Sequence, residues 1–568
     1  MRCALGVVAL AACGGRASAP RRDVATDARA VDAMAEGEPP RGKTIALVYT
    51  SNVGAEYERC GCPVHPLGGL GRRAAEVDEI RAESDGVVSV DAGDLFLPLD
   101  EPRTGARPPA ASEVERRARL LASAYARLGV TAFSPGERDL ALGAPLLQRV
   151  LADAKVPVVS ANLFDLRGRP LFAADRLVDV AGLKIGIFGV TALASEDPRR
   201  LRAWGVEAHD AVTAARAEVA SLRARGARVV VALVHAGGGP DNRRLVAAVP
   251  GVDWAVLGHS GLNLETPERA ATPGGDGARL LEALSLGRNL GRLDLHVVAR
   301  DGVGSFVDRG ARAQLQAILA DHRQQVVDYE QRLPTTQSQP TLNDYYAKRL
   351  VALRAAIARE TRELAATPAR VTGNWFENRI VPLDTRVADQ PGVASLVAEY
   401  NRQSDRLAAE GKPVGVSARV AGAPVHVAPL TEAPTATYVG TASCVSCHRP
   451  AAEFWRATKH ARALATLEQA HRARSPACIG CHVTGYLQPG GTDDVEVATT
   501  RLGDVGCESC HGPGSAHVVA PSAPGKIARA VAASVCLGCH TPDQTNAGFD
   551  YLAFRGAIVG PGHGAPAR

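Results

Sequence analysis

The most specific chemical pattern in the chain is Cys-X-X-Cys-His, which occurs four times near the carboxy-terminal end. Two thiols one helical turn apart can each form a thioether with a haem vinyl group, and the adjoining histidine can present a ring nitrogen to the iron. A zinc site would also use cysteine pairs, but it would not need a histidine directly after every second cysteine. The sequence therefore predicts four covalently bound c-type haems, with attachment cysteines Cys444, Cys447, Cys478, Cys481, Cys507, Cys510, Cys536 and Cys539 and proximal ligands His448, His482, His511 and His540.

Each haem iron has a second axial position, which a histidine can fill or which stays open. Four histidines of this region lie outside the motifs: His460, His471, His517 and His563. They would permit two histidine ligands on every iron, the usual arrangement in electron carriers. We favour His460 and His517 as distal ligands over His471 and His563. For each of the four, the alternative is a surface histidine in a loop.

The amino terminus has the composition of an export signal. A single arginine is followed by the apolar run Ala4 to Ala12 and then by Cys13, a stretch too short to span a bilayer. Leu10 to Cys13 resembles the bacterial lipoprotein cleavage box, which implies a lipid on Cys13; an ordinary signal peptide that contains a cysteine is the alternative. Export agrees with haem attachment, which takes place outside the cytoplasm in bacteria. Because Gly14 is not aspartate, the resemblance favours the periplasmic face or surface of the outer membrane.

Composition and charge limit the class of protein. The 568 residues are 46% hydrophobic and 22% charged, as in an ordinary globular chain, and the net charge of +5 is not gathered in a basic run. These values exclude a wholly disordered or polytopic membrane protein and give no indication of nucleic-acid binding. Changes in composition and periodicity predict these segments: signal and lipobox 1–13, disordered tether 14–42, α/β domain 43–304, helical hairpin 305–366, a return segment 367–410 packing on the α/β domain, linker 411–437 and cytochrome domain 438–568.

The large amino-terminal domain alternates short β-rich runs with helical patterns. Helices are expected over Arg72–Ala82 and Glu113–Leu128. The expected strands are Thr44–Tyr49, Val87–Asp91, Val156–Ser160, Lys184–Val190, Val229–His235 and Val252–Leu257. In an α/β domain of this kind, the loops at strand ends carry the functional side chains.

Several of these strand ends resemble the calcineurin-like metallophosphatases, in particular their 5'-nucleotidase branch. The matching phrases are Gly68 to Arg73, Asp91 to Phe96, Glu137 to Asp139, Ser160 to Leu163, Val234 to Gly237 and Gly258 to Gly261. The resemblance implies a four-layer sandwich, with helices outside two packed sheets. It also implies two divalent metals, bridged by an aspartate, that activate water against a phosphate ester.

The metal ligands of this family are only partly present. Asp94 matches the bridging aspartate, and His235 and His259 match two histidine ligands. At the other ligand positions of the family, this chain has residues that do not match. Asn52 to Gly54 replaces the opening Asp-X-His, Pro135-Gly136 replaces the Asn-His of the third motif, and Gly261 replaces the last ligand. Because these residues cannot hold two dications, we interpret the domain as an inherited scaffold whose dinuclear centre is lost.

One cysteine pair remains after the other cysteines are assigned. Eight belong to the haem motifs, and Cys13 and Cys3 lie in the signal, which leaves Cys60 and Cys62 after the opening strand. Two cysteines one residue apart can form a strained disulfide or bind a soft metal ion. For this pair, a structural disulfide and a redox or metal-binding role are both open. The domain could also hold one divalent or soft metal ion.

The carboxy-terminal region resembles the tetrahaem cytochrome module of nitrifier hydroxylamine-linked electron carriers. The phrases that carry the resemblance run from Tyr438 to Cys444, Phe454 to Ala461, Cys478 to Tyr486 and Cys507 to His517. It implies closely stacked haem pairs that pass electrons, mostly with histidine on both sides of the iron. The family also contains a five-coordinate haem, for which His482 is the candidate here.

Together these features predict a lipid-anchored, extracytoplasmic electron carrier whose partners are other redox proteins, such as cytochromes. An electron carrier is favoured over a hydrolase because the haem motifs are intact and the metal motif is broken. A metal-dependent phosphoester or nucleotide hydrolase that carries a cytochrome, and a haem enzyme acting on a small nitrogen or sulfur compound, are the alternatives.

Overall fold

The computed structural model describes most of the chain, and the account below is confined to the parts that it describes. These are residues 42–60, 66–99, 111–192, 198–259, 267–270, 277–298, 306–337, 340–410, 436–474, 476–492, 494–540 and 551–560. A helical hairpin within residues 309–372 forms one compact unit, and residues 41–308 together with 373–568 form the other.

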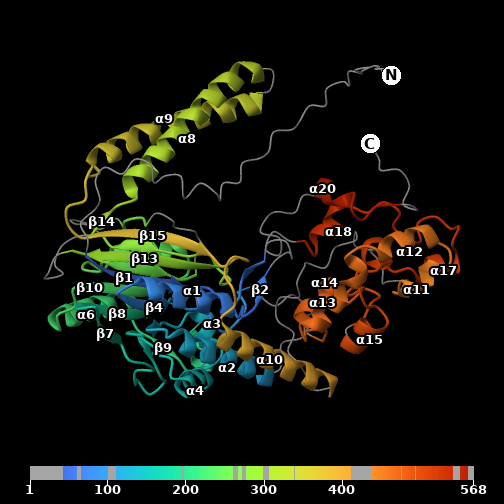
Figure 1. Ribbon diagram of the computed structural model, residues 1–568, viewed down its shortest axis with the longest axis horizontal. Helices are drawn as coiled ribbons and strands as arrows, with labels where there is room; N and C mark the ends of the chain where they lie inside the picture. The colour runs from blue at the N-terminus through green and yellow to red at the C-terminus, as the bar shows by residue number, and fades with distance from the viewer. Residues whose placement is uncertain are drawn as a thin grey trace, which may run out of the picture. The chain divides into compact units, whose positions relative to one another are not determined.

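Two mixed β-sheets form the centre of the α/β domain (Figure 1). The six-stranded sheet has the order β14 (Val307–Asp308), β15 (Trp375–Pro382), β13 (Asn289–Val297), β1 (Lys43–Thr50), β4 (Gly86–Asp91) and β5 (Ala132–Phe133). The five-stranded sheet has the order β12 (Arg279–Leu281), β11 (Trp254–Leu257), β10 (Val229–His235), β8 (Leu183–Thr191) and β7 (Asp175–Val180). Strands β1 and β4 are parallel, as are β8, β10 and β11, so the carboxyl ends within each of these groups lie at one edge.

Successive side chains of the central strands point to opposite faces of their sheet, and this produces the layers. Ile45, Leu47 and Tyr49 of β1 pack in a core between the sheets, whereas Ala46 and Val48 pack under helices on the outer face. Strand β10 alternates in the same way between the inner core and a second outer core. Because both faces of each strand are buried, the strands read as continuous apolar runs. The domain is therefore the four-layer α/β sandwich that the sequence predicts.

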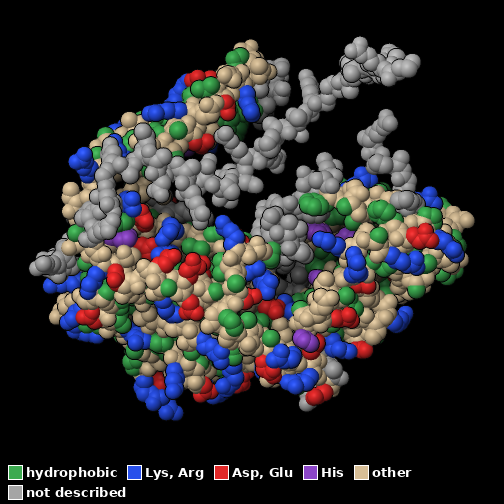
Figure 2. Space-filling model, in the orientation of Figure 1, with side chains coloured by type: hydrophobic (Ala, Val, Ile, Leu, Met, Phe, Trp, Pro, Cys, Tyr) green, Lys and Arg blue, Asp and Glu red, His purple; other side chains and the backbone are tan. Residues whose placement is uncertain are grey.

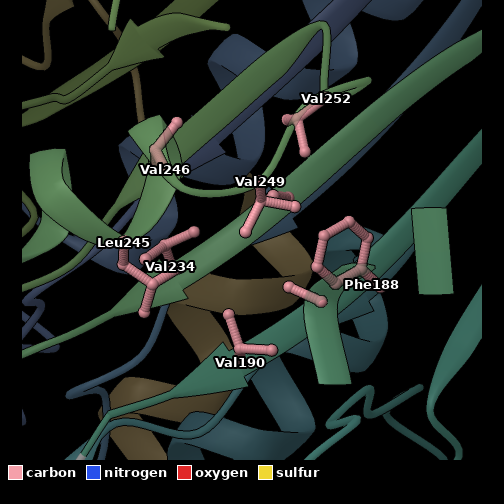
Figure 3. Close-up of a pocket in the computed structure, with 9 residues that line it drawn as sticks. Phe188, Val190, Val234, Leu245, Val246, Val249 and Val252 are labelled. Carbon is pink, nitrogen blue, oxygen red and sulfur yellow. The ribbon is translucent and has the colours of Figure 1, made fainter. Parts of the chain in front are cut away.

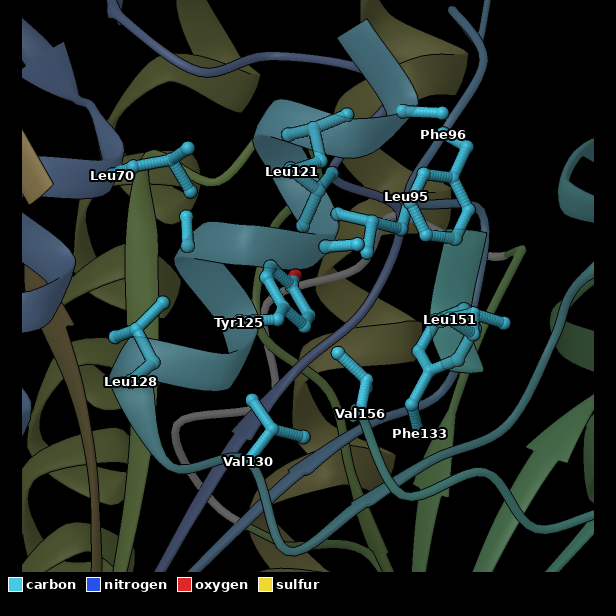
Figure 4. Close-up of a cluster of buried hydrophobic side chains, with 14 of the residues drawn as sticks. Leu70, Leu95, Phe96, Leu121, Tyr125, Leu128, Val130, Phe133, Leu151 and Val156 are labelled. Carbon is cyan, nitrogen blue, oxygen red and sulfur yellow. The ribbon is translucent and has the colours of Figure 1, made fainter. Parts of the chain in front are cut away.

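Helices cover both outer faces. The first face carries α1 (Leu70–Glu83), α2 (Ala111–Leu128), α4 (Ala144–Ala154) and α10 (Pro391–Ala409), and Figure 4 shows part of the cluster beneath them, including Leu121, Tyr125 and Phe133. The second face carries α6 (Ala211–Ala224) and α7 (Gly239–Ala247). Shorter elements complete the domain: β2 (Arg59–Cys60), β3 (Leu67–Gly68), α3 (Glu137–Leu140), β6 (Leu163–Phe164), α5 (Pro198–Ala203) and β9 (Glu207–Ala208).

One predicted strand is wrong. Residues 156–160 make only isolated bridges, from Val158 to Phe133 and from Val159 to Ala173. The neighbouring strand β5 is only two residues long, so a longer ladder has no partner on that side. The other predicted strands and both predicted helices are present, with ends shifted by at most two residues.

The hairpin unit contains α8 (Ala311–Arg332), the 3-10 turn η3 (Leu333–Thr336) and α9 (Pro340–Ala366). Leu319, Leu350 and Leu353 are its buried leucines. His322 lies 3.0 Å from the carboxylate of Glu360, which is the packing of a structural histidine.

The carboxy-terminal region has short helices, and its described residues contain no strand of two or more residues. A small core includes Leu464, Leu467, Ile479 and Tyr486. The helices are α11 (Ala442–Val445), α12 (Arg449–Arg456), η4 (His460–Arg462), α13 (Ala463–Gln469), α14 (Pro476–His482), α15 (Val495–Thr500), α16 (Cys507–His511), α17 (Ser515–Val519), α18 (Ala533–Leu537) and α20 (Tyr551–Arg555). Within the described parts of the chain, no helix is both long and apolar enough to cross a membrane.

Figure 2 shows one face of the molecule, where basic and acidic side chains are interspersed. The small gap in Figure 3, between β8, β10 and the α7 region, is lined by Phe188, Val190, Val234, Leu245 and other apolar side chains and has no room for a water molecule. It is a packing feature of the second outer core, so the candidate sites lie elsewhere.

Candidate functional sites

Three polar side chains from different strand ends converge at one edge of the sandwich. Asp94 follows β4, His235 ends β10 and His259 follows β11. One ligand atom from each lies within 4.8 Å of the other two. Asp94 and His259 both have positive φ angles (59° and 61°), a conformation that non-glycine residues seldom adopt and that often occurs at functional sites.

The cluster is deep on one side and open on the other. Asp94 Oδ2 lies 3.4 Å from His235 Nε2 and 3.7 Å from His259 Nδ1. The side chains of Asp94 and His235 are 2% exposed, whereas that of His259 is 30% exposed. An ion or small ligand would therefore reach the buried atoms past His259.

The ring of His235 is fixed by its other nitrogen. Nδ1 lies 2.8 Å from the carbonyl oxygen of Ala92, so Nδ1 carries the proton that is donated there. Nε2 is buried and makes no hydrogen bond. Gly136 and Gly258 press against the ring: a Cβ at Gly258 would lie 2.2 Å from Nδ1, and one at Gly136 would lie 2.5 Å from Cε1. The Nε2 atom of His235 is therefore held toward Asp94, whose Oδ2 lies 3.4 Å away.

Asp139 supports the loop that carries Asp94. Its carboxylate accepts hydrogen bonds from the backbone N–H groups of Asp94, Leu95, Phe96 and Gly136, at 2.8 to 2.9 Å. Burial and the charge of Asp94 raise the pKa of Asp139 to about 7, although these hydrogen bonds favour its charged form. Asp139 therefore joins the β4 loop to the start of α3 rather than facing the site.

The sequence analysis quoted Glu137 in a matching phrase but did not name it as a site residue. It aligned the third motif with Pro135-Gly136, but Gly136 caps the start of α3 and lacks a side chain. Instead, Oε1 of Glu137 lies 3.6 Å from Nδ1 of His259. The phrase Gly-Glu-Arg-Asp could have indicated Glu137, because this glutamate directly follows the turn at the edge of the sheet.

Within its described residues 51–59, the opening loop offers no ligand to the cluster. Asn52 accepts a hydrogen bond at its Oδ1 from the backbone N–H of His259, at 2.7 Å. Gly54 has a φ of 61°, and a Cβ there would lie 2.7 Å from Leu99. This loop therefore helps to position the backbone of His259 through Asn52.

The electrostatic state of the cluster follows from burial and pairing. Burial favours neutral Asp94, but His235 and the hydrogen bonds to Asp94 outweigh it and lower its pKa well below the usual range. Burial opposes protonation of His235, but Asp94 outweighs it and raises the pKa of His235 to about 9. Asp94 is therefore an anion that attracts positive charge into a buried position.

Several predicted site residues lie outside the described residues. These are Cys13, Cys62 and His563, and Gly261, where the family's last ligand is missing, lies outside them as well. Cys60 is described only as a backbone position of β2, where it pairs with Leu67.

The Cys-X-X-Cys-His motifs of the second and third copies lie on helices. Helix α14 carries Cys478 to His482, and α16 carries Cys507 to His511. The Nδ1 atoms of His482 and His511 lie 2.7 Å from backbone carbonyl oxygens, those of Ala463 and Ala528. A histidine that donates its Nδ1 proton in this way uses Nε2 when it binds a metal. Both motifs therefore fit covalent haem with a proximal histidine.

Two proximal histidines face a second histidine ring. His448 and His517 have ring centroids 6.1 Å apart, and His460 and His540 have centroids 6.2 Å apart. An ion held between two imidazole nitrogens at about 2 Å from each separates the ring centroids by roughly 6 Å. The geometry therefore fits an iron between His448 and His517, and another between His460 and His540.

The second motif differs from these. Among the described residues, no second histidine ring lies against His482. His471 is 54% exposed, and its Nδ1 lies 4.0 Å from a carboxylate oxygen of Asp405 in α10. The structure does not bring His471 to a proximal histidine.

The attachment cysteines of different motifs also meet. Cys444 lies beside Cys507, and Cys539 lies beside Cys481. The first motif therefore lies beside the third, and the second beside the fourth.

Comparison with known proteins separates the chain into two regions. The family described as cytochrome c554 and c-prime matches residues 443–512. Cytochrome c-554 of Nitrosomonas europaea is 40% identical over 94 residues, which are 14% of this chain and 40% of that protein. The 2',3'-cyclic-nucleotide 2'-phosphodiesterase/3'-nucleotidase of Yersinia enterocolitica is 28% identical over 235 residues, 37% of this chain and 34% of that protein.

A solved structure, a 5'-nucleotidase precursor from Thermus thermophilus, has a TM-score of 0.44 at 19% identity and covers 64% of this chain and 60% of that one. The chain spans well under half the length of the two curated relatives above. Both resemblances noted in the sequence are confirmed. The chain thus joins a region similar to 5'-nucleotidases and related metallophosphatases to a carboxy-terminal region similar to cytochrome c554.

Proposed function

We propose that the chain is an extracytoplasmic cytochrome with four c-type haems that transfers electrons, joined to an α/β domain whose dinuclear metal centre is lost. The observation that carries the proposal is the facing of His448 with His517 and of His460 with His540 at 6.1 and 6.2 Å. An iron with histidine on both sides has no open position for a substrate, which favours electron transfer over catalysis.

The attachment residues support the same function. Each bound haem would supply a one-electron iron centre, held by two thioethers and a proximal histidine. The contacts of Cys444 with Cys507 and of Cys481 with Cys539 favour two pairs of neighbouring haems. Closely spaced haems would let the domain receive electrons from one redox protein, such as another cytochrome, and deliver them to a second.

The haem count and the ligation are tested together on the purified full-length protein. A pyridine haemochrome assay is expected to give four c-type haems per chain, and dithionite reduction is expected to give sharp c-type bands. Carbon monoxide should change the spectrum of only the minority of haems without two histidines. Clearly fewer than four haems, or carbon monoxide binding to most of them, would contradict the proposal.

Lipid anchoring at Cys13 in the outer membrane is part of the same proposal. Replacement of Cys13 by serine should release the cytochrome into the soluble fraction with its haems intact. Retention of that variant in the membrane fraction would contradict anchoring through Cys13 but not electron transfer.

A phosphoester hydrolase is the second candidate, because Asp94, His235 and His259 still converge. We expect no robust hydrolysis of bis(4-nitrophenyl) phosphate by the full chain with added manganese or zinc. The reason is that a two-metal mechanism needs ligands for a second ion, and the opening loop has Asn52 and Gly54 at those positions. Metal-dependent turnover that is abolished by Asp94→Ala would favour the hydrolase.

A further inference from the structure

We propose that the α/β domain sets the reduction potential of the haem carried by His482, through an ion pair between Glu58 and Arg472. The proposal rests on the proposed electron transfer and concerns its regulation. Glu58 belongs to the opening loop of the α/β domain, and Arg472 follows α13 of the cytochrome region. Both residues lie in the same compact unit of the chain.

Arg472 is fixed beside the second Cys-X-X-Cys-His motif. Its backbone N–H donates a hydrogen bond to the carbonyl oxygen of Leu467 in α13, at 2.7 Å. The next residue, Ala473, is buried in the small core against which Cys478 packs. Burial and the positive charge of Arg472 lower the pKa of His482. Arg472 therefore lies close to an attachment cysteine and to the proximal histidine of one haem.

The opening loop of the α/β domain holds this arginine. Oε2 of Glu58 forms an ion pair with Nη1 of Arg472, and both side chains are only 22% exposed. The other oxygen of Glu58, Oε1, accepts a hydrogen bond of 2.6 Å from the side-chain amide of Asn401 in α10. The guanidinium carbon of Arg472 also lies 5.6 Å from the centre of the Tyr57 ring, a position in which a cation is attracted to the ring. Two consecutive residues of the α/β domain thus fix one arginine of the cytochrome region.

The other arginine of the loop between α13 and α14 has a different partner. Arg474 pairs with Glu496 of the cytochrome region itself, at 3.3 Å. The neighbouring His471 has its Nδ1 4.0 Å from a carboxylate oxygen of Asp405 in α10. The α/β domain therefore presents carboxylates to two consecutive residues that precede the second haem motif, and it supplies the counter-charge of Arg472.

The charge of Arg472 bears on the iron because reduction adds one electron to it. When the haem accepts an electron from a donor, ferric iron becomes ferrous and the net charge of the haem falls by one. An unbalanced positive charge nearby favours the ferrous form and raises the reduction potential, whereas an unbalanced negative charge lowers it. Because the pair is partly buried, salt screens it less than a surface pair. Glu58 balances Arg472 and so keeps the potential of this haem lower than Arg472 alone would.

The test is a redox titration of the full-length protein with mediators, followed through the absorption bands of the haems. Glu58→Gln removes the negative charge and keeps the oxygen that accepts from Asn401. We expect the potential of one haem to rise by about 59 mV, which is a tenfold change in its ferrous-to-ferric ratio. A unit charge about 10 Å away changes a one-electron equilibrium by roughly this factor at an effective dielectric constant of about 20.

The partner variants separate charge from packing. Arg472→Gln should lower the potential of the same haem by a similar amount, and the double variant should return it close to the wild-type value. Arg472→Lys keeps the positive charge and should keep the wild-type potential. Glu399→Gln is the matched control, because it removes a carboxylate of α10 from an exposed pair with Arg402, at 2.7 Å, and should leave every potential unchanged.

The haem that shifts should be the one that binds carbon monoxide, since no second histidine ring lies against His482 in the part of the chain that the structure describes. The proposal is overturned if the potentials of Glu58→Gln stay within about 10 mV of the wild type. Shifts of the same sign in the two single variants, or a shift confined to haems that do not bind carbon monoxide, would also overturn it. The haem count of the same samples tests the electron-transfer proposal separately: four haems with unshifted potentials contradict only the role of Glu58.

Discussion

Replacement of Glu508 by glutamine should destabilise the cytochrome domain although no haem ligand is changed. Glu508 lies inside the third Cys-X-X-Cys-His motif and is 1% exposed. Its carboxylate accepts hydrogen bonds from the backbone N–H groups of Val439 (3.0 Å), Gly440 (2.7 Å) and Gly514 (2.7 Å). Gly514 immediately precedes helix α17, which carries His517. One carboxylate thus ties the start of the domain to the helix with a distal histidine.

The magnitude follows from these three donors. A hydrogen bond to a charged group contributes about 1.5–3 kcal/mol, and a buried donor left without an acceptor costs about 1–3 kcal/mol. Glutamine keeps one oxygen but turns an amide N–H₂ toward at least one backbone N–H. We therefore expect a loss of about 3 kcal/mol in the free energy of unfolding.

Urea unfolding of the full chain, followed by the Soret band, reports on this domain alone. With an m value of about 2 kcal/mol/M, the loss lowers the unfolding midpoint by about 1.5 M. Glu453→Gln, at an exposed carboxylate on α12, is the matched control and should leave the midpoint unchanged. A midpoint shift below about 0.3 M in Glu508→Gln would refute the reasoning, because it would mean that the buried carboxylate contributes no more than a surface one.

Three further outcomes are expected. His517→Ala and His460→Ala should each open one haem, seen as one additional carbon monoxide bound per chain; an unchanged stoichiometry would contradict the distal assignment. Gly258→Ala places a Cβ 2.2 Å from His235 Nδ1 and should lower the urea unfolding midpoint of the α/β domain; an unchanged midpoint would show that the glycine is not needed to hold the ring. Burial and a neighbouring aspartate raise the pKa of Glu218 from 4.5 to about 7, so the folded state holds this proton more tightly and the free energy of unfolding should fall as pH rises between these values. Glu218→Gln should reduce that fall in urea titrations, and equal slopes in the two proteins would argue against it.

The spacing of residues along the chain was sufficient to predict features that lie within one helical turn or one strand. Cys-X-X-Cys-His places two thiols and an imidazole on a single helical turn, so the motif specifies haem attachment without reference to the rest of the fold. The β-rich runs predicted the strands of the sandwich because each is buried on both faces, and only the run at 156–160 failed, for lack of a long neighbouring strand. The resemblances then indicated which fold each region adopts.

The tertiary structure decided which distant residues meet. The facing of His448 with His517 and of His460 with His540 depends on how the short helices fold back on one another, which no spacing along the chain specifies. The approach of Glu137 to His259 likewise depends on the turn at Gly136 and on two strands from different sheets ending at one edge. Side chains that converge from separate elements are positioned by packing across the whole domain, so the sequence could name the types of side chain but not which of them meet.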